Sequence, residues 1–438
     1  MRRRQTEYRK VSELKPHPKN VRAHPAKQIN LLVKSIKQFG FTNPPLIDEN
    51  DMTLAGHARL LAAEKAGLNE VPVVVLRGLS EAEKRAYVLA DNKIAELAGY
   101  DRPALVVELQ ELSSLLGDIG LDLALTGFEP AEIDALFADL VDPETQPGDD
   151  VPPIATAAVS RKGDLWLLGD SHRLLCDDSR NADYGRLTRR ERAAMMFADP
   201  PYNVSIPKTV GRGRTKHRNF AMASGEMPPA AFTEFLVDAL TPAVEHSIDG
   251  ALHYVCMDWR HMRELLDAGD RIYSELKNLV VWSKTNPGQG SLYRSQHELI
   301  FVYKSGSGPH LNNVELGRHG RNRSNVWTYP GATSFRSGRM PDLAAHPTVK
   351  PVALVADAMR DCSRRGDIVL DPFMGIGTTI QAAERIGRRA YGIEIDPLYV
   401  DAAVRRWQSA TKRDAVLEET GKAFDVVATA RRSGRRTT

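Results

Sequence analysis

Short apolar segments alternate with helical ones through the second half of this 438-residue chain, and few folds accommodate that order. The segments with the length and composition of buried strands are 165–168, 173–176, 194–198, 252–257, 279–282, 299–303, 368–370 and 390–393. Strands that alternate with helices usually form a mostly parallel sheet with helices on both faces. We therefore predict an α/β fold for residues 160–412.

Two of the predicted strands end in segments with polar side chains or glycines. Asp199-Pro200-Pro201-Tyr202 follows the apolar run 193–198, and residues 371–379 (Asp-Pro-Phe-Met-Gly-Ile-Gly-Thr-Thr) follow the strand 368–370. Open α/β sheets bind their ligands beyond the carboxyl ends of their strands. Both segments are therefore expected to border a ligand site.

The segment 371–379 has the features of a ligand-binding loop. Gly375 and Gly377 let the backbone approach a nucleoside, and a helix that begins near Thr378 directs amide groups and partial positive charge at an anion. A dinucleotide is disfavoured, because Ile380 stands where G-x-G-x-x-G needs its third glycine. The next strand ends at Glu394, whose carboxylate suits a ribose diol.

Together and in this order, the two segments resemble the catalytic and S-adenosylmethionine motifs of the amino-methylating DNA methyltransferases, those that modify adenine N6 or cytosine N4. The order is that of the permuted, beta-type class, and the resemblance covers residues 160–410. It implies a Rossmann-like, S-adenosylmethionine-dependent sheet. It also implies that Asp199 and the carbonyl groups of Pro200 and Pro201 accept hydrogen bonds from the exocyclic amine. Tyr202 would stack on a base flipped out of the duplex.

The resemblance further implies which residues hold the cofactor. Asp371 would meet the ammonium group, Phe373 would lie near the adenosine, and the helix at Thr378 would face the carboxylate. The implied cofactor-binding residues are Asp178, Lys350, Asp371, Phe373, Gly375, Gly377, Thr378 and Glu394. No metal is expected, because the sulfonium supplies the electrophile and the chain has no cluster of metal ligands.

Two members of that set come from weaker matches. The segment 346–351 (His-Pro-Thr-Val-Lys-Pro) resembles the family's H-P-x-x-K-P segment, which places Lys350 near the methionine end of the cofactor. Taken alone, it is equally typical of a helix start with a charged residue. The turn at 176–179 resembles the family's G-D-S turn and places Asp178 near the adenine, although Asp177 replaces the glycine.

Within this family, Asp at the first motif position is commoner in adenine-N6 enzymes and Ser in cytosine-N4 enzymes, so Asp199 favours adenine N6. Methylation of cytosine N4 stays open. So does an RNA or nucleotide-like small substrate. The remaining alternative is a nucleotide-switched DNA-binding protein whose methylase domain is inactive.

Double-stranded DNA is the expected partner of two basic segments, 204–228 and 304–345, of which the second is the expected recognition segment. Their Lys and Arg side chains can neutralise phosphates and read base edges. The predicted DNA-binding residues are Lys208, Arg212, Arg214, Arg318, Arg321 and Arg323. The alternative for both segments is a solvated basic loop.

Residues 1–100 form a predicted α+β domain that resembles the N-terminal domain of ParB-like partition proteins, a fold shared with sulfiredoxins. The resemblance rests on residues 11–22, on the Gly56-His57-Ala58-Arg59 segment and on residues 89–93. It implies a nucleotide pocket at Gly56, His57 and Arg59, or a DNA-binding accessory role. The commoner pattern has Arg where Ala58 stands, which favours a domain that positions the methylase on DNA.

Composition restricts the remaining possibilities. The net charge is only +3, the three cysteines are far apart, and no apolar stretch approaches the roughly 20 residues of a membrane span. We expect a cytoplasmic, nucleoid-associated protein, and leave open a homodimer and a cognate restriction nuclease. Between the two predicted domains lie a helical extension (101–141) and a linker rich in Pro and acidic residues (142–159). A basic tail follows at 413–438.

Overall fold

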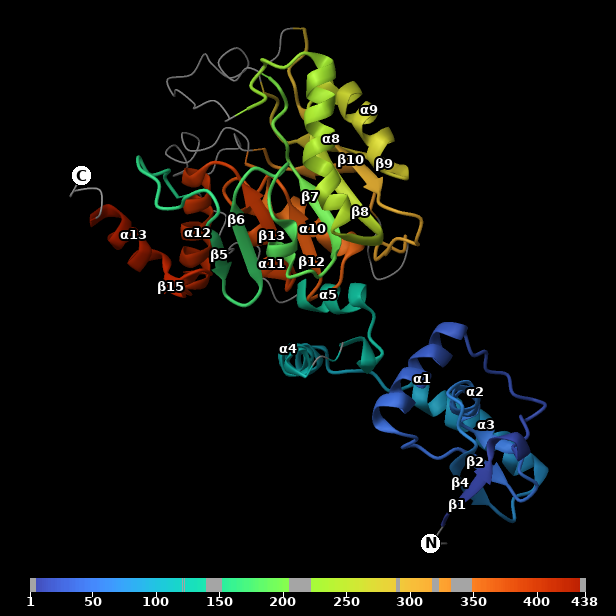
Figure 1. Ribbon diagram of the computed structural model, residues 1–438. Coiled ribbons are helices and arrows are strands. Elements are labelled where there is room, and N and C mark those ends of the chain that lie inside the picture. Colours follow the sequence, from blue (N-terminus) through green and yellow to red (C-terminus); the bar gives the residue numbers. More distant parts are fainter. Residues whose placement is uncertain are drawn as a thin grey trace. The chain divides into compact units, whose positions relative to one another are not determined.

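The computed structural model describes residues 5–119, 121, 123–138, 152–204, 222–288, 292–316, 323–331 and 349–433 (Figure 1). The chain divides into two compact units, Met1–Phe137 and Ala138–Thr438. Most of the predicted linker lies outside the described residues. No helix in the described ranges combines the length and the apolar character that crossing a bilayer would require.

The first unit contains a four-stranded sheet in the order β1-β4-β2-β3. Its strands are β1 (Thr6–Lys10), β2 (Leu46–Asp48), β3 (Thr53–Ala55) and β4 (Glu70–Leu76). Its helices are α1 (Ala26–Phe39), α2 (His57–Lys65), α3 (Glu81–Glu96), α4 (Arg102–Asp118) and most of α5 (Pro130–Ala138). The apolar face of α1 packs on α2 through Ile29, as its helical periodicity predicts.

The second unit is built on an 11-stranded sheet in the order β11-β9-β10-β8-β7-β12-β13-β6-β5-β14-β15. Its strands are β5 (Leu165–Leu168), β6 (His172–Cys176), β7 (Ala193–Ala198), β8 (Ser247–Met257), β9 (Glu275–Lys284), β10 (His297–Lys304), β11 (Val326–Tyr329), β12 (Ile368–Asp371), β13 (Arg389–Glu394), β14 (Ala415–Leu417) and β15 (Lys422–Ala423). All eight predicted strands are therefore present.

The sheet was predicted to be mostly parallel, but only about half of its strand pairs are parallel. Among the described residues, β8, β7, β12, β13 and β6 run parallel to one another, and β11 runs parallel to β9. The remaining pairs, which involve β10, β5, β14 and β15, are antiparallel. Strand-like composition is similar in both arrangements, so the direction of pairing could not be inferred from it.

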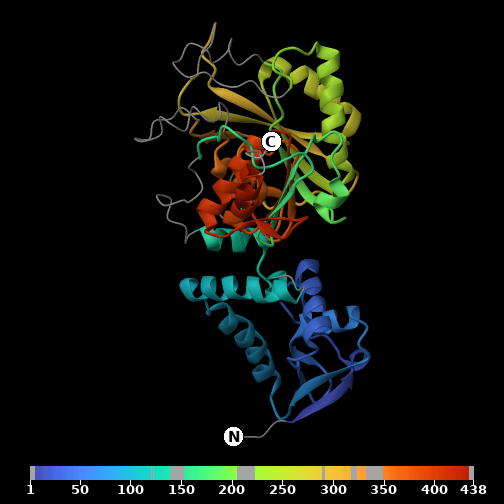
Figure 2. The same ribbon diagram turned by 60° about the vertical axis from the view of Figure 1, so that its left-hand side comes forward.

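Helices cover both faces of this sheet (Figures 1 and 2). One face packs against α10 (Val352–Cys362), α11 (Thr378–Ile386), α12 (Pro397–Thr411) and α13 (Phe424–Ser433). The other face packs against α6 (Tyr184–Thr188), α8 (Pro229–Glu245) and α9 (Met262–Ile272). In β7 the side chains alternate between these cores: Met195 and Phe197 face the first, and Met196 faces the second.

The connections place a crevice between β7 and β12. The chain leaves β7 through α8 to reach β8 on one side, and it leaves β12 through α11 to reach β13 on the other. Such a reversal of direction opens a ligand crevice at the carboxyl ends of the two strands. Asp199 directly follows β7, and Asp371 ends β12.

Candidate active site

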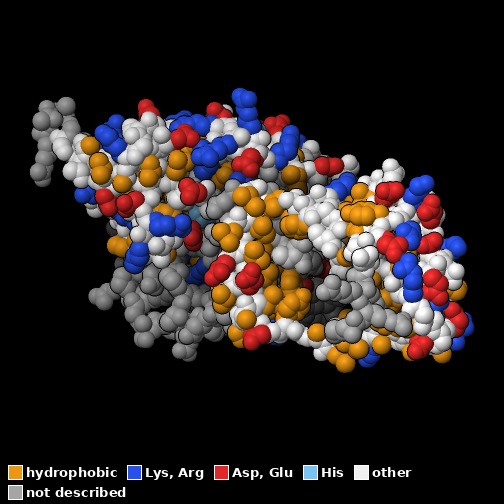
Figure 3. Space-filling model, turned by 90° about the horizontal axis from the view of Figure 1, so that it is seen from below, with side chains coloured by type: hydrophobic (Ala, Val, Ile, Leu, Met, Phe, Trp, Pro, Cys, Tyr) orange, Lys and Arg blue, Asp and Glu red, His pale blue; other side chains and the backbone are white. Residues whose placement is uncertain are grey.

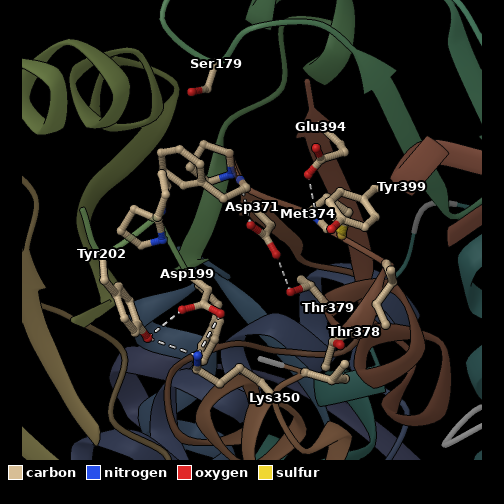
Figure 4. Close-up of a pocket in the computed structure, with 18 of the residues that line it drawn as sticks. Ser179, Asp199, Tyr202, Lys350, Asp371, Met374, Thr378, Thr379, Glu394 and Tyr399 are labelled. Atoms are coloured by element: carbon tan, nitrogen blue, oxygen red, sulfur yellow. Dashed lines mark hydrogen bonds and ion pairs between the residues drawn. The ribbon is translucent and has the colours of Figure 1, made fainter. Parts of the chain in front are cut away.

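A pocket of about 340 Å³ lies at this crevice (Figure 4). In Figure 4, Asp199, Tyr202 and Lys350 converge on one side, Glu394 and Tyr399 lie on the other, and Asp371 lies between them. The predicted site residues that line the pocket are Asp178, Asp199, Pro200, Pro201, Tyr202, Lys350, Asp371, Phe373, Gly375, Thr378 and Glu394. The fold thus gathers around one cavity residues that are up to 216 positions apart in the sequence, from Asp178 to Glu394.

Asp199 is held by two donors. The Tyr202 hydroxyl donates to its Oδ1 at 2.7 Å, and the Lys350 ammonium donates to its Oδ2 at 2.7 Å. Burial raises the pKa of Asp199, Lys350 opposes this rise, and the negative charge of Glu298 adds to it. Pro200 and Pro201 stiffen the turn that presents the carboxylate, because each fixes its own backbone φ.

Lys350 lies on the side of the pocket that holds Asp199 and Tyr202. Its ammonium lies 3.0 Å from the Tyr202 hydroxyl and 3.0 Å from Glu298 Oε2, besides its contact with Asp199. Only 4% of its side chain is exposed. Burial alone would lower the pKa of Lys350, but the two carboxylates raise it, so the ammonium stays charged. The contact with the methionine end of the cofactor that its motif implied stays a prediction.

Sequence reasoning missed two residues of this cluster, Glu298 and Lys284. Glu298, near the start of β10, accepts from Lys350 and also from Lys284 of β9 at 2.5 Å. Burial opposes its charge, but the ammonium groups of Lys350 and Lys284 outweigh burial and lower the pKa of Glu298 to about 2. The available signal was a glutamate directly before the apolar run Leu299–Tyr303, where a buried charge needs a partner.

Asp371 joins β12 to the helix that follows the glycine-rich loop. Its Oδ1 accepts the Phe373 N–H at 2.9 Å, and its Oδ2 accepts the Thr379 hydroxyl at 2.5 Å. Burial nevertheless raises the pKa of Asp371 to about 7. A buried carboxylate with a raised pKa is a good binding partner for a cationic group that enters the pocket.

Gly377 does not line the pocket but allows the loop to adopt its shape. It has φ +81° and caps α11, and a Cβ placed on it would lie 3.0 Å from the Cβ of Ala403 in α12. Gly375 also has a positive φ, of 54°. Only glycine adopts such backbone angles without strain, so the loop can place the first amides of α11 toward the cavity.

Glu394 lies on the opposite side of the same loop. Its Oε2 accepts the Gly375 N–H at 2.8 Å, and its Oε1 accepts the Asp396 N–H at 2.8 Å. Burial raises its pKa to about 7 despite these bonds. Asp396 caps α12 by accepting the Leu398 N–H at 2.9 Å.

Asp178 borders the pocket with its charge already paired. Its carboxylate lies 2.6 Å from the Arg180 guanidinium, and this hydrogen bond lowers its pKa. A direct contact between Asp178 and an adenine stays a prediction.

Most of the predicted DNA-binding residues lie outside the described part of the chain, namely Lys208, Arg212, Arg214, Arg318 and Arg321. Arg323 is described, and its guanidinium lies 3.0 Å from Asp357, 3.1 Å from Asp361 and 4.5 Å from the centre of the Trp327 ring. Its DNA contact stays a prediction that has to compete with these partners. On the face shown in Figure 3, the described Lys and Arg side chains are interspersed with Asp and Glu.

The N-terminal segment around Gly56 forms a tight strand-to-helix turn. Gly56 has φ +93° and caps α2, and the His57 ring accepts the His17 N–H at 3.2 Å. Burial lowers the pKa of His57, and His24 and His17 add to this effect. A nucleotide pocket at Gly56, His57 and Arg59 stays a prediction. Among the described residues of the whole chain, no cluster of His, Cys, Asp or Glu is arranged to hold a metal ion.

Family models match three parts of the chain. One described as DNA methylase matches residues 193–405, and one described as ParB N-terminal domain matches residues 2–93. The chain therefore contains an N6/N4 DNA methylase domain. A third model, a ParB-methyltransferase HTH domain, matches residues 103–162, a range that includes α5 and all of α4 except Arg102. This DNA methylase therefore carries a ParB-like N-terminal domain.

Two curated proteins each match a short stretch of the chain. The ParB-like nuclease domain-containing protein YnaK of Escherichia coli K12 is 50% identical over 78 residues, which are 18% of this chain and 90% of YnaK. The type II methyltransferase M.ScaI of Streptomyces caespitosus is 38% identical over 90 residues, which are 20% of this chain and 30% of that enzyme.

Two solved structures match the chain at low identity and low TM-score. The M1.HpyAVI–SAM complex has 18% identity and a TM-score of 0.38, and the match covers 54% of this chain and 98% of that one. The cytosine-N4-specific PvuII DNA methyltransferase has 13% identity and a TM-score of 0.43, with 64% and 95% coverage.

Proposed function

We propose that this DNA methylase transfers a methyl group from S-adenosylmethionine to N6 of an adenine that is flipped out of DNA. The observation that carries the proposal is the partly buried Asp199 carboxylate, which is paired with the Lys350 ammonium in a pocket that also contains Asp371 and Glu394. An acceptor for an amine and a site for a cationic nucleoside are thereby adjacent.

The pocket fits S-adenosylmethionine by the chemistry of its donors and acceptors. Asp371 and Glu394 are buried carboxylates whose pKa values are raised, so each gains from a ligand that supplies a positive charge or hydroxyl donors. Asp371 would hold the ammonium group and Glu394 the ribose hydroxyls. The amide end of α11 at Thr378 would face the carboxylate. When bound, this cofactor supplies a methyl group activated by the adjacent sulfonium.

The residues of the chain prepare the amine to react. The lone pair of an exocyclic amine is delocalised into the base, so an acceptor that binds its N–H group localises the pair on nitrogen. Asp199 is suited to this task because Tyr202 and Lys350 fix it before the base arrives, and because Lys350 opposes the rise in its pKa that burial causes. The proton that the amine loses would pass to Asp199 or to water.

Adenine N6 is proposed over cytosine N4 because the acceptor is a carboxylate. The family tendency that links Asp to adenine supports this choice, and Asp199 points into the pocket beside Tyr202 (Figure 4). Tyr202 is partly buried, and its ring would offer a face to the flipped base.

Methyl transfer to unmethylated DNA tests this proposal. DNA would be incubated with labelled S-adenosylmethionine, digested to nucleosides and analysed by mass, with Asp199→Asn as the matched variant. N6-methyladenine from the wild type and a loss of about 100-fold or more in the variant are expected. N4-methylcytosine would keep the reaction and overturn the base. No labelled DNA despite cofactor binding would overturn the DNA substrate in favour of RNA or of a DNA-binding protein.

The remaining roles complete the proposal. We infer that the basic segments around Arg212 and Arg321 hold the DNA, and that the protein acts at the nucleoid in the cytoplasm. The segment Gly56–Arg59 is proposed as a nucleotide or DNA accessory site. A gel-shift titration of DNA with the protein, with and without added free nucleotide, would separate these two accessory roles.

A further inference from the structure

Charged groups of alternating sign run from the edge of the pocket to the catalytic carboxylate. Lys284 lies 2.5 Å from Glu298, Glu298 lies 3.0 Å from Lys350, and Lys350 lies 2.7 Å from Asp199. The first two come from the neighbouring strands β9 and β10, and Lys350 comes from the segment before α10. Glu298 and Lys350 are both buried side chains, with 13% and 4% exposed.

Lys350 therefore divides its charge between two carboxylates. A carboxylate that is paired alone with an ammonium is largely neutralised, and its oxygens accept further hydrogen bonds less strongly. Because Glu298 takes part of the Lys350 charge, Asp199 keeps more of its own negative charge while still being fixed in place. Tyr202 strengthens the arrangement, since its hydroxyl lies 2.7 Å from Asp199 and 3.1 Å from Glu298.

We propose that Glu298 is a positioning residue that sets the acceptor strength of Asp199 by competing with it for the Lys350 ammonium, and that Lys284 limits this competition. Lys284 acts in the opposite sense to Glu298, because it supplies Glu298 with a second cation and so releases Lys350 toward Asp199. This inference rests on the proposed methyl transfer and concerns residues that do not touch the base.

Five groups from the surrounding elements face Asp199, and apart from Lys350 and Glu298 they do not change the competition for the Lys350 ammonium. They are Lys350 from the segment before α10, Glu298 from β10, Tyr202 from the loop after β7, Cys256 from β8 and Asp371 from β12. Burial raises the pKa of both Tyr202 and Cys256, so neither carries charge at neutral pH. Burial raises the pKa of Asp371 to about 7, and a bound ammonium group would keep it ionised.

The test is the pH dependence of single-turnover methyl transfer with saturating cofactor and DNA, in Glu298→Gln and Lys284→Met. In the wild type, the rate rises with pH as Asp199 ionises. Glu298→Gln removes a negative charge near Asp199, so this rise should move to lower pH, and the plateau rate should fall about 10-fold or more because Asp199 is now neutralised by Lys350. Lys284→Met removes a positive charge, so the rise should move to higher pH.

Opposite shifts in the two variants would support the proposal, since a purely structural role would lower the rate without moving the two profiles apart. Shifts in the same direction, or no shift in either variant, would overturn it. Glu275→Gln is the matched control, because Glu275 pairs with Lys304 at the other ends of the same two strands, 3.6 Å apart. Its profile should coincide with that of the wild type.

The experiment distinguishes failure of the proposed role of Glu298 from misfolding of a variant and from failure of the proposed function. If Glu298→Gln does not fold, Lys284→Met still tests the proposal, since the Lys284 side chain is 25% exposed. If the wild type methylates no DNA, the proposed function has failed. If the wild type is active and the profiles do not diverge, only the role of Glu298 has failed. Affinity for S-adenosylmethionine should stay within about 2-fold in both variants, because neither residue is among those proposed to hold the cofactor.

Discussion

The Thr379 hydroxyl donates a hydrogen bond of 2.5 Å to the Asp371 carboxylate. The bond joins the last residue of β12 to the first turn of α11 and holds the glycine-rich loop between them. Burial raises the pKa of Asp371 to about 7 in spite of this bond. The carboxylate is thus placed where a cationic ligand would restore its charge.

Cofactor affinity should depend on pH in a predictable direction. The pKa values of Asp371 and Glu394 are both raised to about 7, and only their ionised forms attract an ammonium group or accept from hydroxyls without first losing a proton. We expect the dissociation constant of S-adenosylmethionine to rise as pH falls from 8 to 6, by calorimetry at each pH. An affinity that stays constant across this range would contradict the assignment of both residues.

Asp371→Asn should separate stability from binding. A carboxyl group whose pKa is raised on folding stabilises the folded state fully at low pH, and this stabilisation is lost as pH rises through the folded value, here about 7. Asn can accept the Phe373 N–H through Oδ1 and donate to the Thr379 hydroxyl through Nδ2, without the charge. The variant should therefore melt a few degrees higher than the wild type at pH 8, by roughly 2–4 °C per kcal/mol. Its cofactor affinity should fall about 10-fold or more. Equal melting temperatures of the variant and the wild type at pH 8 would contradict a destabilising charge on Asp371.

Gly377→Ala should distort the loop. A Cβ at this position would lie 3.0 Å from the Ala403 Cβ, and the φ of +81° is unfavourable for any residue with a side chain. We expect a loss of about 1–2 kcal/mol in the free energy of unfolding and weaker cofactor binding. Adding Ala403→Gly should relieve the contact but not the φ strain, so only part of the stability should return. Full recovery would show that the backbone angle is unimportant.

Lys350→Met should reduce the rate more than it reduces cofactor affinity. Without the ammonium, Asp199 and Glu298 face each other without a cation, and the pKa of Asp199 should rise further. We expect the single-turnover rate at pH 7 to fall about 100-fold, with a change in cofactor affinity of less than about 3-fold. Equal losses in rate and affinity would instead support the position beside the methionine end that the H-P-x-x-K-P resemblance implied.

Arg323→Ala should destabilise the methylase unit. The guanidinium is 18% exposed and neutralises Asp357 and Asp361 over the Trp327 ring. Its loss should lower the free energy of unfolding by about 1–3 kcal/mol, measured by urea denaturation. If the unfolding curve is unchanged while DNA affinity falls, the sequence-based role in DNA binding is the correct one.

The local features of the site could be predicted because neighbouring residues set them. The apolar run before Asp199 predicts a buried strand, and the glycines at 375 and 377 predict a sharp turn into a helix, since backbone sterics act over a few residues. The cap of α12 by Asp396 follows from the same local logic. Family motifs then supplied the chemistry of these two segments.

The sequence by itself determined the strands, the two motif segments and their order, because periodicity, glycine angles and helix caps depend on short stretches of chain. Only the tertiary structure decided that β7 and β12 are neighbours, that half of the sheet is antiparallel, and that Lys350 meets Asp199 beside Glu298. Those contacts join residues from about 50 to 170 positions apart. Their partners are selected by the packing of the whole sheet and by the need of buried charges for a counter-charge, and neither can be read from a local pattern.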